Sequence, residues 1–199
     1  HLESFDLNKN TRLKWKLLSG PFDMTITPEG ILKWNNSKLG HHAYEIQLSD
    51  GVDSVQWKAE IYVNAPPEIT SKPITVVIEG KRYEYALTAW DPNILDPNNS
   101  LVENKIIFSL AQGPEGLNID ENNMLTWETR ETPLGEYMTT IVASDGIAGD
   151  IQVFPIFINS LPVITSSDSI IIQIGKNLNF QIEASDKNLT DTLTFHLDP

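Results

Sequence analysis

The chain has 199 residues, of which 40% are hydrophobic and 21% charged, an ordinary balance for folded domains that excludes a disordered chain. Its formal net charge of -13 at pH 7 repels nucleic-acid phosphates and anionic lipid surfaces, so nucleic acid is not an expected partner. The absence of cysteine excludes disulfides, cysteine-ligated zinc and thiol catalysis. No apolar run approaches the roughly 20 residues that cross a bilayer, so no direct membrane span is expected.

An internal repeat with a period of about 95 residues organises the sequence. When the chain is compared with itself at that offset, identical residues pair over a long stretch in which the offset does not drift. The pairs are Gly40 with Gly135, Asp50-Gly51 with Asp145-Gly146, Asn64 with Asn159, Pro67 with Pro162, Ile69-Thr70-Ser71 with Ile164-Thr165-Ser166, Gly80-Lys81 with Gly175-Lys176, Ala89 with Ala184, Asp91 with Asp186, and Asp96 with Asp191. A constant offset predicts tandem copies of one domain.

The earlier part of the first copy matches with the register moved by two residues. Gly20-Pro21 corresponds to Gly113-Pro114, and Trp34 corresponds to Trp127, so that proline and tryptophan are thirteen residues apart in both copies. The sequence therefore predicts three segments. Residues 1–65 form a partial first repeat without its opening strands, residues 66–160 form a complete repeat, and residues 161–199 hold only the opening strands of a third.

Short runs of alternating apolar and polar residues predict strands in the complete copy. Tyr83, Tyr85 and Leu87 alternate with polar residues, and Leu178 and Phe180 keep this alternation in the third copy. In chain order the predicted strands are residues 74–78, 81–89, 105–110, 117–119, 124–127, 137–143 and 151–158. Turn-forming residues separate these runs, and we find no convincing period of 3.6 residues, which excludes a helical domain.

Seven or so short strands in about 95 residues predict an all-β domain with two facing sheets. Trp34 and Trp127 each end a predicted strand, so we expect them to fill the cores of their repeats. Trp90 lies beside the Asp91 loop, where it is expected to cap the end of the sandwich.

The motifs of the complete copy resemble those of a known repeat family. They are Gly113-Pro114-Glu115-Gly116-Leu117-Asn118-Ile119-Asp120, Leu125-Thr126-Trp127, Leu134-Gly135-Glu136-Tyr137 and Ala143-Ser144-Asp145-Gly146. The pattern resembles the bacterial Ig-like repeats related to the cadherin-like modules of dystroglycan. The resemblance covers essentially the whole chain, and it implies tandem Ig-like or cadherin-like Greek-key β-sandwiches in an extracellular spacer or adhesion array. A fold shared by many functions does not name one of them.

The acidic loops at the repeat ends are the candidate metal site. Asp91, Asn93 and Asp96 lie in one loop, and Asp186, Asn188 and Asp191 occupy the same positions in the next copy, with Asp145 in a separate Asp-Gly turn. Ca²⁺ prefers six to eight oxygen ligands, which closely spaced Asp and Asn side chains supply. The family resemblance implies calcium at junctions between domains, so Ca²⁺ is the candidate cofactor.

Two features favour a different interpretation of these loops. The linkers, residues 63–67 and 158–162, lack the acidic residues of true cadherins, and Lys187 places a positive charge inside one loop. Asp and Asn also stabilise turns through hydrogen bonds to their own backbone. In this second interpretation the loop residues stabilise the fold and bind no metal.

Carbohydrate binding and catalysis are two further functions that the sequence can be tested against. Trp57 lies on a predicted strand between Gln56 and Lys58, and an exposed indole there would stack on a sugar; its equivalent in the second copy is Gln152. Burial of Trp57 is the favoured interpretation, because tryptophan covers a large area. We find no catalytic motif, and a sandwich of this size rarely carries a catalytic cleft, so we expect no enzyme activity and no catalytic residues.

The two partial repeats raise the question of how their cores are covered, because half a sandwich exposes apolar side chains and unpaired strand edges. One explanation is that the polypeptide continues at both ends. Another is head-to-tail complementation, in which residues 161–199 of one molecule complete the sandwich begun by residues 1–65 of the next.

The sequence thus predicts a non-enzymatic structural or adhesion module that acts as a spacer or protein-interaction array. Its expected partners are other protein subunits or neighbouring repeats, with carbohydrate as a further candidate. A carbohydrate-binding module and an accessory subunit of an envelope assembly are the rival functions. We expect an extracellular, cell-surface or periplasmic location, and the lack of cysteine favours a bacterial envelope.

Overall fold

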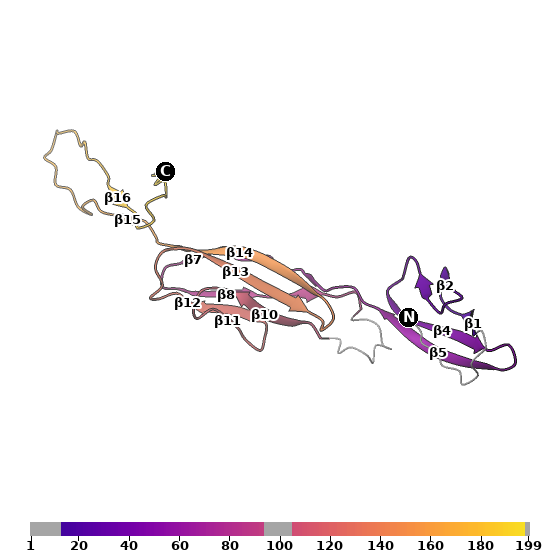
Figure 1. Cartoon of the computed structure of the whole chain (residues 1–199). Helices are drawn as coiled ribbons and strands as arrows, with labels where there is room; N and C mark the ends of the chain where they lie inside the picture. The colour runs from indigo at the N-terminus through magenta and orange to yellow at the C-terminus, as the bar shows by residue number, and fades with distance from the viewer. Residues whose placement is uncertain (1–12, 94–104, 198–199) are drawn as a thin grey trace. The chain divides into compact units, whose positions relative to one another are not determined.

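A computed structural model describes residues 13–93 and 105–197 of the chain, which form strands, turns and loops (Figure 1). The prediction of an all-β protein is confirmed. The described residues contain no helix of the length and apolar character that a membrane crossing requires. Two compact units are present. The first comprises residues 1–68, 90–107 and 144–150, and the second comprises residues 69–89, 108–143 and 151–199. Each of these units combines separate segments of the chain, whereas the predicted repeats are continuous segments. The repeat boundaries remain a prediction.

The first unit contains one antiparallel sheet and one hairpin. Strands β1 (Lys14–Ser19), β4 (Gly40–Ser49) and β5 (Ser54–Val63) form the sheet in the order β1-β4-β5. The hairpin consists of β2 (Met24–Ile26) and β3 (Leu32–Trp34). Alternating residues of β4 point to the core, where Tyr44 and Ile46 pack with Met24. Residues packed around this core are Trp15, Leu17, Ile26, Leu32, Trp34, Ala59 and Ile61.

Two facing sheets account for most strands of the complete repeat, as Figure 1 shows. One sheet has the order β10-β13-β14-β7, and the other has the order β11-β12-β8. Their bounds are β7 Val76–Ile78, β8 Arg82–Ala86, β10 Ile107–Gln112, β11 Asn118–Ile119, β12 Met124–Glu128, β13 Gly135–Ser144 and β14 Gly149–Asn159. Strands β6 (Glu68–Ile69) and β9 (Ala89–Trp90) form a further two-stranded sheet. Seven strands, β7, β8 and β10 to β14, match the predicted strands of this repeat with small shifts at their ends. Strand β6 was not predicted, and the predicted run 81–89 is divided between β8 and β9.

The core of the second unit lies between these sheets. It includes Tyr83, Tyr85 and Leu87, which the alternation in the sequence placed on one face of a strand. Trp127 is 2% exposed, as predicted for a core tryptophan. Residues buried with them are Val77, Leu117, Leu125, Ile141, Phe154, Ile156 and Ile158.

The spacing of thirteen residues between proline and tryptophan has a structural cause that both repeats share. The indole N–H of Trp127 donates a hydrogen bond to the carbonyl of Glu115 at 3.0 Å, and that of Trp34 donates to Phe22 at 3.1 Å. In each case the acceptor is the residue after the proline of the turn. Gly113 leaves space for the buried Leu117, because a Cβ at position 113 would lie 2.7 Å from a methyl carbon of that side chain and would displace it. The tryptophan thus ties the turn to the core.

The third copy differs from its prediction. Only β15 (Val163–Ile164) and β16 (Ala184–Ser185) form strands there, and they pair with each other. Leu178 and Phe180, expected on the buried face of a strand, are exposed and lie outside strands, as is Ile182. In the complete repeat the corresponding strand β8 pairs with β12, whereas residues 161–197 contain no counterpart of β12. An alternating pattern forms a strand only when a partner satisfies its backbone.

Candidate functional site

Three of the predicted site residues come together in the first unit. Asp91 and Asn93 are each 4% exposed and Asp145 is 8% exposed, so all three are buried polar groups. They surround the linker that follows β5, and Asp145 lies at the same end as the Asp91 loop, a point that the sequence left open. Asp96 lies outside the described residues.

The side chain of Asn93 holds the linker backbone at two points. Its Oδ1 accepts a hydrogen bond from the backbone N–H of Ala65 at 2.8 Å, and its Nδ2 donates to the carbonyl of Val63 at 3.2 Å. The backbone N–H of Asn93 donates to Oδ1 of Asp91 at 2.7 Å, which fixes the loop. We call this arrangement the linker clasp. It consists of an asparagine, the linker backbone groups that its side chain binds, and the aspartate two residues before it.

An asparagine is the appropriate residue because its amide offers an acceptor and donors in one plane, as a peptide group does. An aspartate carboxylate would accept the bond from Ala65 but would have no donor for the carbonyl of Val63. The clasp therefore satisfies two backbone groups of the linker, which buried groups require.

A second contact reinforces the first linker. Nδ2 of Asn64 donates to Oδ2 of Asp145 at 2.7 Å, and Oδ1 of Asp145 accepts the N–H groups of Ile147 and Ala148, each at 2.7 Å. Burial raises the pKa of Asp145, but the hydrogen bonds from Ala148, Asn64 and Ile147 together outweigh it and lower the pKa below the ordinary value of 3.8. The carboxylate is the stable form in this position.

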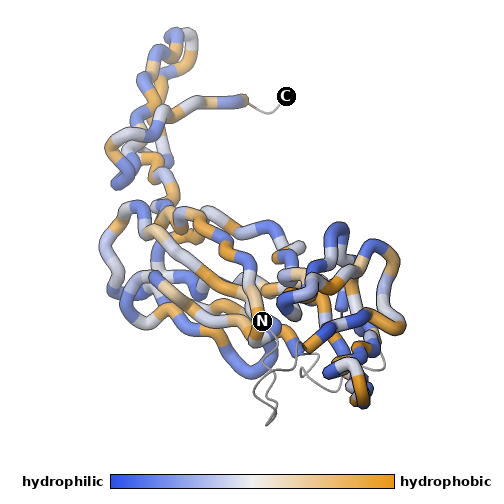
Figure 2. The backbone as a smooth tube through the Cα atoms, turned by 45° about the vertical axis from the view of Figure 1, so that its right-hand side comes forward, coloured by the Kyte–Doolittle hydropathy of each residue, from blue (hydrophilic) through white to orange (hydrophobic). Residues whose placement is uncertain are grey.

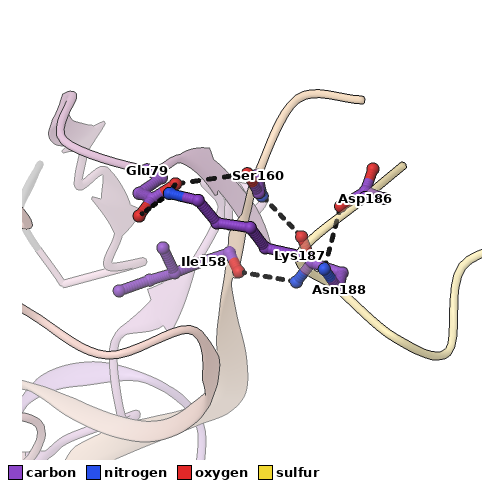
Figure 3. Close-up of polar contacts among 6 residues, drawn as sticks. All are labelled: Glu79, Ile158, Ser160, Asp186, Lys187 and Asn188. Carbon is purple, nitrogen blue, oxygen red and sulfur yellow. Dashed lines mark hydrogen bonds and ion pairs between the residues drawn. The ribbon is translucent and has the colours of Figure 1, made fainter. Parts of the chain in front are cut away.

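The same clasp recurs 95 residues later, within the second unit (Figure 3). Oδ1 of Asn188 accepts the N–H of Ser160 at 2.6 Å, and Nδ2 of Asn188 donates to the carbonyl of Ile158 at 3.3 Å. The N–H of Asn188 donates to Oδ1 of Asp186 at 2.8 Å. Each of the three bonds has its counterpart at Asn93, so the clasp is a property of the repeat.

Lys187, the positive charge inside the second loop, reinforces this clasp. Figure 3 shows its side chain reaching Glu79, where Nζ lies 3.0 Å from Oε1 and 2.9 Å from Oε2. The hydroxyl of Ser160 donates to Oε2 of the same carboxylate at 3.2 Å. The hydrogen bond from Lys187 is the main reason why the pKa of Glu79 lies below its ordinary value. In the first loop the position of Lys187 is occupied by Pro92.

Four of the residues proposed as calcium ligands, Asp91, Asn93, Asp186 and Asn188, each use one side-chain oxygen as an acceptor within the clasps. Asp91 and Asp186 each bind a backbone N–H of their own loop, as expected of residues that stabilise a turn. Asp191 is exposed, and its N–H donates to the carbonyl of Asn188 at 3.0 Å. Within the described part of the chain, no three His, Cys, Asp or Glu side chains are grouped so that they could hold a metal ion. Calcium binding remains a prediction.

Asp186 and Asp191 line one cavity of about 520 Å³ in the second unit. Its other walls include apolar residues of the third copy, among them Val163, Ile164 and Phe195. Ile164 is 69% exposed, whereas its counterpart Ile69 packs against the core of the complete repeat. The apolar wall residue Ile164 is therefore exposed where its counterpart in the complete repeat is covered.

Trp57 is half exposed, which differs from the burial that the sequence analysis favoured. Its ring lies 6.0 Å from that of Tyr44 in an edge-to-face arrangement. Trp57 is paired with Ile46 across β4 and β5, so both side chains lie on the core face of the sheet. Trp90, expected at the end of the sandwich, is 52% exposed.

The linker groups that the clasps and the contacts beside them bind were not predicted from the sequence. Four of them are backbone atoms, which carry no residue-specific signal in a sequence. Asn64 and Ser160 do carry one: Asn64 belongs to the repeat pattern, and both lie in segments that the sequence identified as linkers.

The solved structures to which this chain is similar include extracellular domains and enzymes, and its overall similarity to each of them is low. No protein-family model matches the sequence, and no curated protein does. Among solved structures, Drosophila N-cadherin EC1-4 is 18% identical with a TM-score of 0.39, and the match covers 92% of this chain and 52% of the cadherin chain. Drosophila OTK extracellular domains 3-5 are 11% identical with a TM-score of 0.45, covering 74% and 51%.

An endo-fucoidan hydrolase from glycoside hydrolase family 107 is also similar, at 17% identity and a TM-score of 0.37, with 77% of this chain and 24% of the enzyme covered. This chain therefore spans between about a quarter and about half of the three structures named. The sandwich architecture itself is assigned from the sheets of this chain.

We expect the substitution Asn188→Ala to weaken the second clasp. It leaves the buried N–H of Ser160 and the carbonyl of Ile158 without the amide, which costs roughly 1–3 kcal/mol of unfolding free energy. Asn188→Asp keeps the acceptor but faces the carbonyl with a carboxylate, so it too is destabilising. Urea unfolding, and hydrogen exchange at the amide of Ser160, measure these effects. The exposed Asn177→Ala is the control, and equal behaviour of Asn177→Ala and Asn188→Ala would contradict the clasp.

We expect Asn64→Ala to reduce the acid sensitivity of the fold. Because the pKa of Asp145 is lower in the folded state, its stabilisation is complete above the ordinary value of 3.8 and is lost as the pH falls through the folded pKa. Removing Asn64 raises the folded pKa towards 3.8, so less stability is lost between about pH 5 and pH 2. Unfolding free energies measured across this range for the native chain, Asn64→Ala and the exposed control Asn122→Ala test this, and identical slopes would refute it.

Proposed function

We propose that this chain is a non-enzymatic repeat array that acts as a spacer or protein-interaction scaffold on a cell surface. The observation that carries this proposal is the recurrence of the linker clasp, with the same three hydrogen bonds at Asn93 and at Asn188. The clasp recurs with the repeat and binds the linker that joins two domains. Its role therefore concerns how consecutive domains are connected, and not a site within one domain.

The chemistry of the linkers supports a spacer. Each linker contains proline, at Pro66 and Pro67 in the first and Pro162 in the second, and proline restricts backbone rotation. The clasp further restricts rotation of the linker backbone. In each linker it binds the carbonyl before and the N–H after one asparagine, which is Asn64 in the first linker and Asn159 in the second. A linker restrained in both ways transmits position along a chain better than a flexible one.

The net charge of -13 fits the same role, because like-charged arrays repel one another and stay soluble at a crowded surface. An extracellular, cell-surface or periplasmic location, in a bacterial envelope, is part of the proposal. It is supported by the lack of cysteine, since small secreted domains of animals more commonly carry disulfides.

A distance measurement across the first linker tests the spacer. Because the chain has no cysteine, spin labels can be attached at Asp53→Cys and Asn122→Cys, both at exposed positions. We expect a narrow distance distribution in the native chain and a broader one in Asn93→Ala, because that variant frees the linker backbone. Asn177→Ala is the matched control. A native distribution as broad as that of Asn93→Ala would overturn the proposal.

Calcium is proposed as a ligand of the acidic loops, and a thermal titration tests it. Binding to the folded state raises the unfolding midpoint with ligand concentration. If the loops bind calcium, the midpoint rises on addition of CaCl₂, and the double variant Asp91→Asn with Asp186→Asn lacks this rise. A midpoint that calcium leaves unchanged would eliminate calcium from the function of this chain.

A further inference from the structure

The outer faces of the two sheets in the complete repeat differ in chemistry. On the sheet β11-β12-β8 the outward residues include charged ones, and Nε of Arg82 lies 3.2 Å from Oε1 of Glu84 and 3.5 Å from Oε1 of Glu128. Strands β7, β10, β13 and β14 of the other sheet contain no lysine or arginine. Apolar residues, orange in Figure 2, occupy long stretches of the strands in this unit. The second sheet therefore lacks the mixed charges that the first presents to water.

Exposed apolar side chains gather on the outside of this four-stranded sheet. Phe154 and Ile156 are buried, and successive residues of a strand point to opposite faces, so Ile151 lies on the outer side of β14. Met138 on β13 and Val76 on β7 alternate with core residues in the same way. The exposed apolar residues on the outside of these three neighbouring strands are Val76 (51%), Met138 (45%), Ile151 (62%) and Val153 (59%). We call these four residues the outer apolar face.

The first repeat carries polar residues at positions that correspond to this face. At the offset of 95 residues, Ile151 corresponds to Gln56 and Val153 corresponds to Lys58. Lys58 pairs with Glu45 across β4 and β5, and their charged groups lie 4.0 Å apart. The same sheet position is therefore compatible with polar side chains, and the fold itself does not require an apolar outer face.

The exposure of the outer apolar face does not come from a missing part of the repeat. Both sheets of the complete repeat are present, and its core is closed between them. The face lies on the side of the sheet that points away from that core, where antiparallel strands ordinarily carry polar residues. Contiguous exposed apolar surface on a folded domain marks a site of interaction. A partner outside the repeat is therefore the expected occupant.

The charge beside this face indicates which kind of partner fits. Glu136 is exposed and lies two residues before Met138 on β13, so both point outward, and the four strands of the sheet carry no cation. The net charge of -13 disfavours a second copy of the chain and an anionic lipid surface. None of the four residues of the face is aromatic, so the face offers no exposed ring on which a sugar would stack.

We propose that the outer apolar face binds a partner protein that presents apolar side chains with lysine or arginine beside them. The apolar side chains of the partner cover Ile151 and Val153, and its basic residue lies against Glu136. An apolar centre with a polar rim is the usual composition of such an interface. This inference rests on the proposed function, because it names the surface by which the interaction scaffold holds its partner.

Two synthetic peptides serve as probes of this surface. One is an amphipathic helix with a stripe of leucines flanked by lysines, and the other has glutamate in place of every lysine. In calorimetric titrations of the full chain at about 0.15 M salt, we expect the lysine peptide to bind at least tenfold more tightly than the glutamate peptide. The double variant Ile151→Gln with Val153→Gln weakens binding of the lysine peptide about tenfold or more, because less apolar surface is buried.

Val52→Gln combined with Leu189→Gln is the matched control. These residues are 87% and 94% exposed and lie outside the outer apolar face, so this variant should bind the lysine peptide as the native chain does. Glu136→Gln should weaken binding of the lysine peptide about twofold to fivefold and leave binding of a leucine-glutamine peptide unchanged. Circular dichroism and urea unfolding verify that the variants, all at exposed positions, keep the native fold.

Equal binding of the two charged peptides would overturn the proposal, and so would binding that the double variant leaves unchanged. Self-association in sedimentation equilibrium that the double variant abolishes would overturn it in favour of a second copy. Binding to phosphatidylcholine vesicles that the double variant abolishes would overturn it in favour of a lipid surface. Each of these results would leave the spacer intact, because the distance distribution across the first linker depends on Asn93 and not on this face.

Discussion

The linker clasp is the interaction on which the repeat organisation depends. A linker between two sandwiches exposes its peptide groups unless something binds them, and the carboxamides of Asn93 and Asn188 bind one carbonyl and one N–H each. An amide does this because it has the same donor and acceptor arrangement as the backbone that it replaces. The preceding aspartate holds the amide in position by binding the backbone N–H of the asparagine. Loop and linker are therefore ordered by one set of hydrogen bonds.

The contacts around the two clasps differ, although the clasps themselves do not. In the first, Asn64 binds the buried carboxylate of Asp145, and in the second, Lys187 and Ser160 bind Glu79. The ion pair of Lys187 and Glu79 is exposed to solvent, and exposed ion pairs contribute little to stability because water and salt screen them. The bonds common to both linkers are those of the asparagine. The supporting contacts differ because several kinds of residue can restrict the linker further once the asparagine holds its backbone.

Strand formation in this chain depends on partners more than on local pattern. Tyr83 and Tyr85 lie on a strand that pairs with β12 and packs in a core, whereas Leu178 and Phe180 follow the same alternation without forming a strand. Trp57 shows the same dependence from the other side, since it faces the core yet remains half exposed. A two-sheet sandwich is stable when both apolar faces are covered, which is why the alternating pattern by itself does not decide burial.

The sequence by itself determined the period of about 95 residues, the all-β character of the chain, the strands of the complete repeat and the core position of Trp127. These follow from local alternation and from residues that recur at a fixed offset, both of which a sequence displays. It also located the loops of Asp91 and Asp186, but it left open whether their oxygens bind a cation or the backbone. Tertiary structure decided that Asn93 binds Val63 and Ala65, that Asp145 lies at the same end, and that Trp57 is uncovered. Those outcomes depend on which backbone groups and sheet edges meet in space, and peptide groups are the same at every position of a sequence.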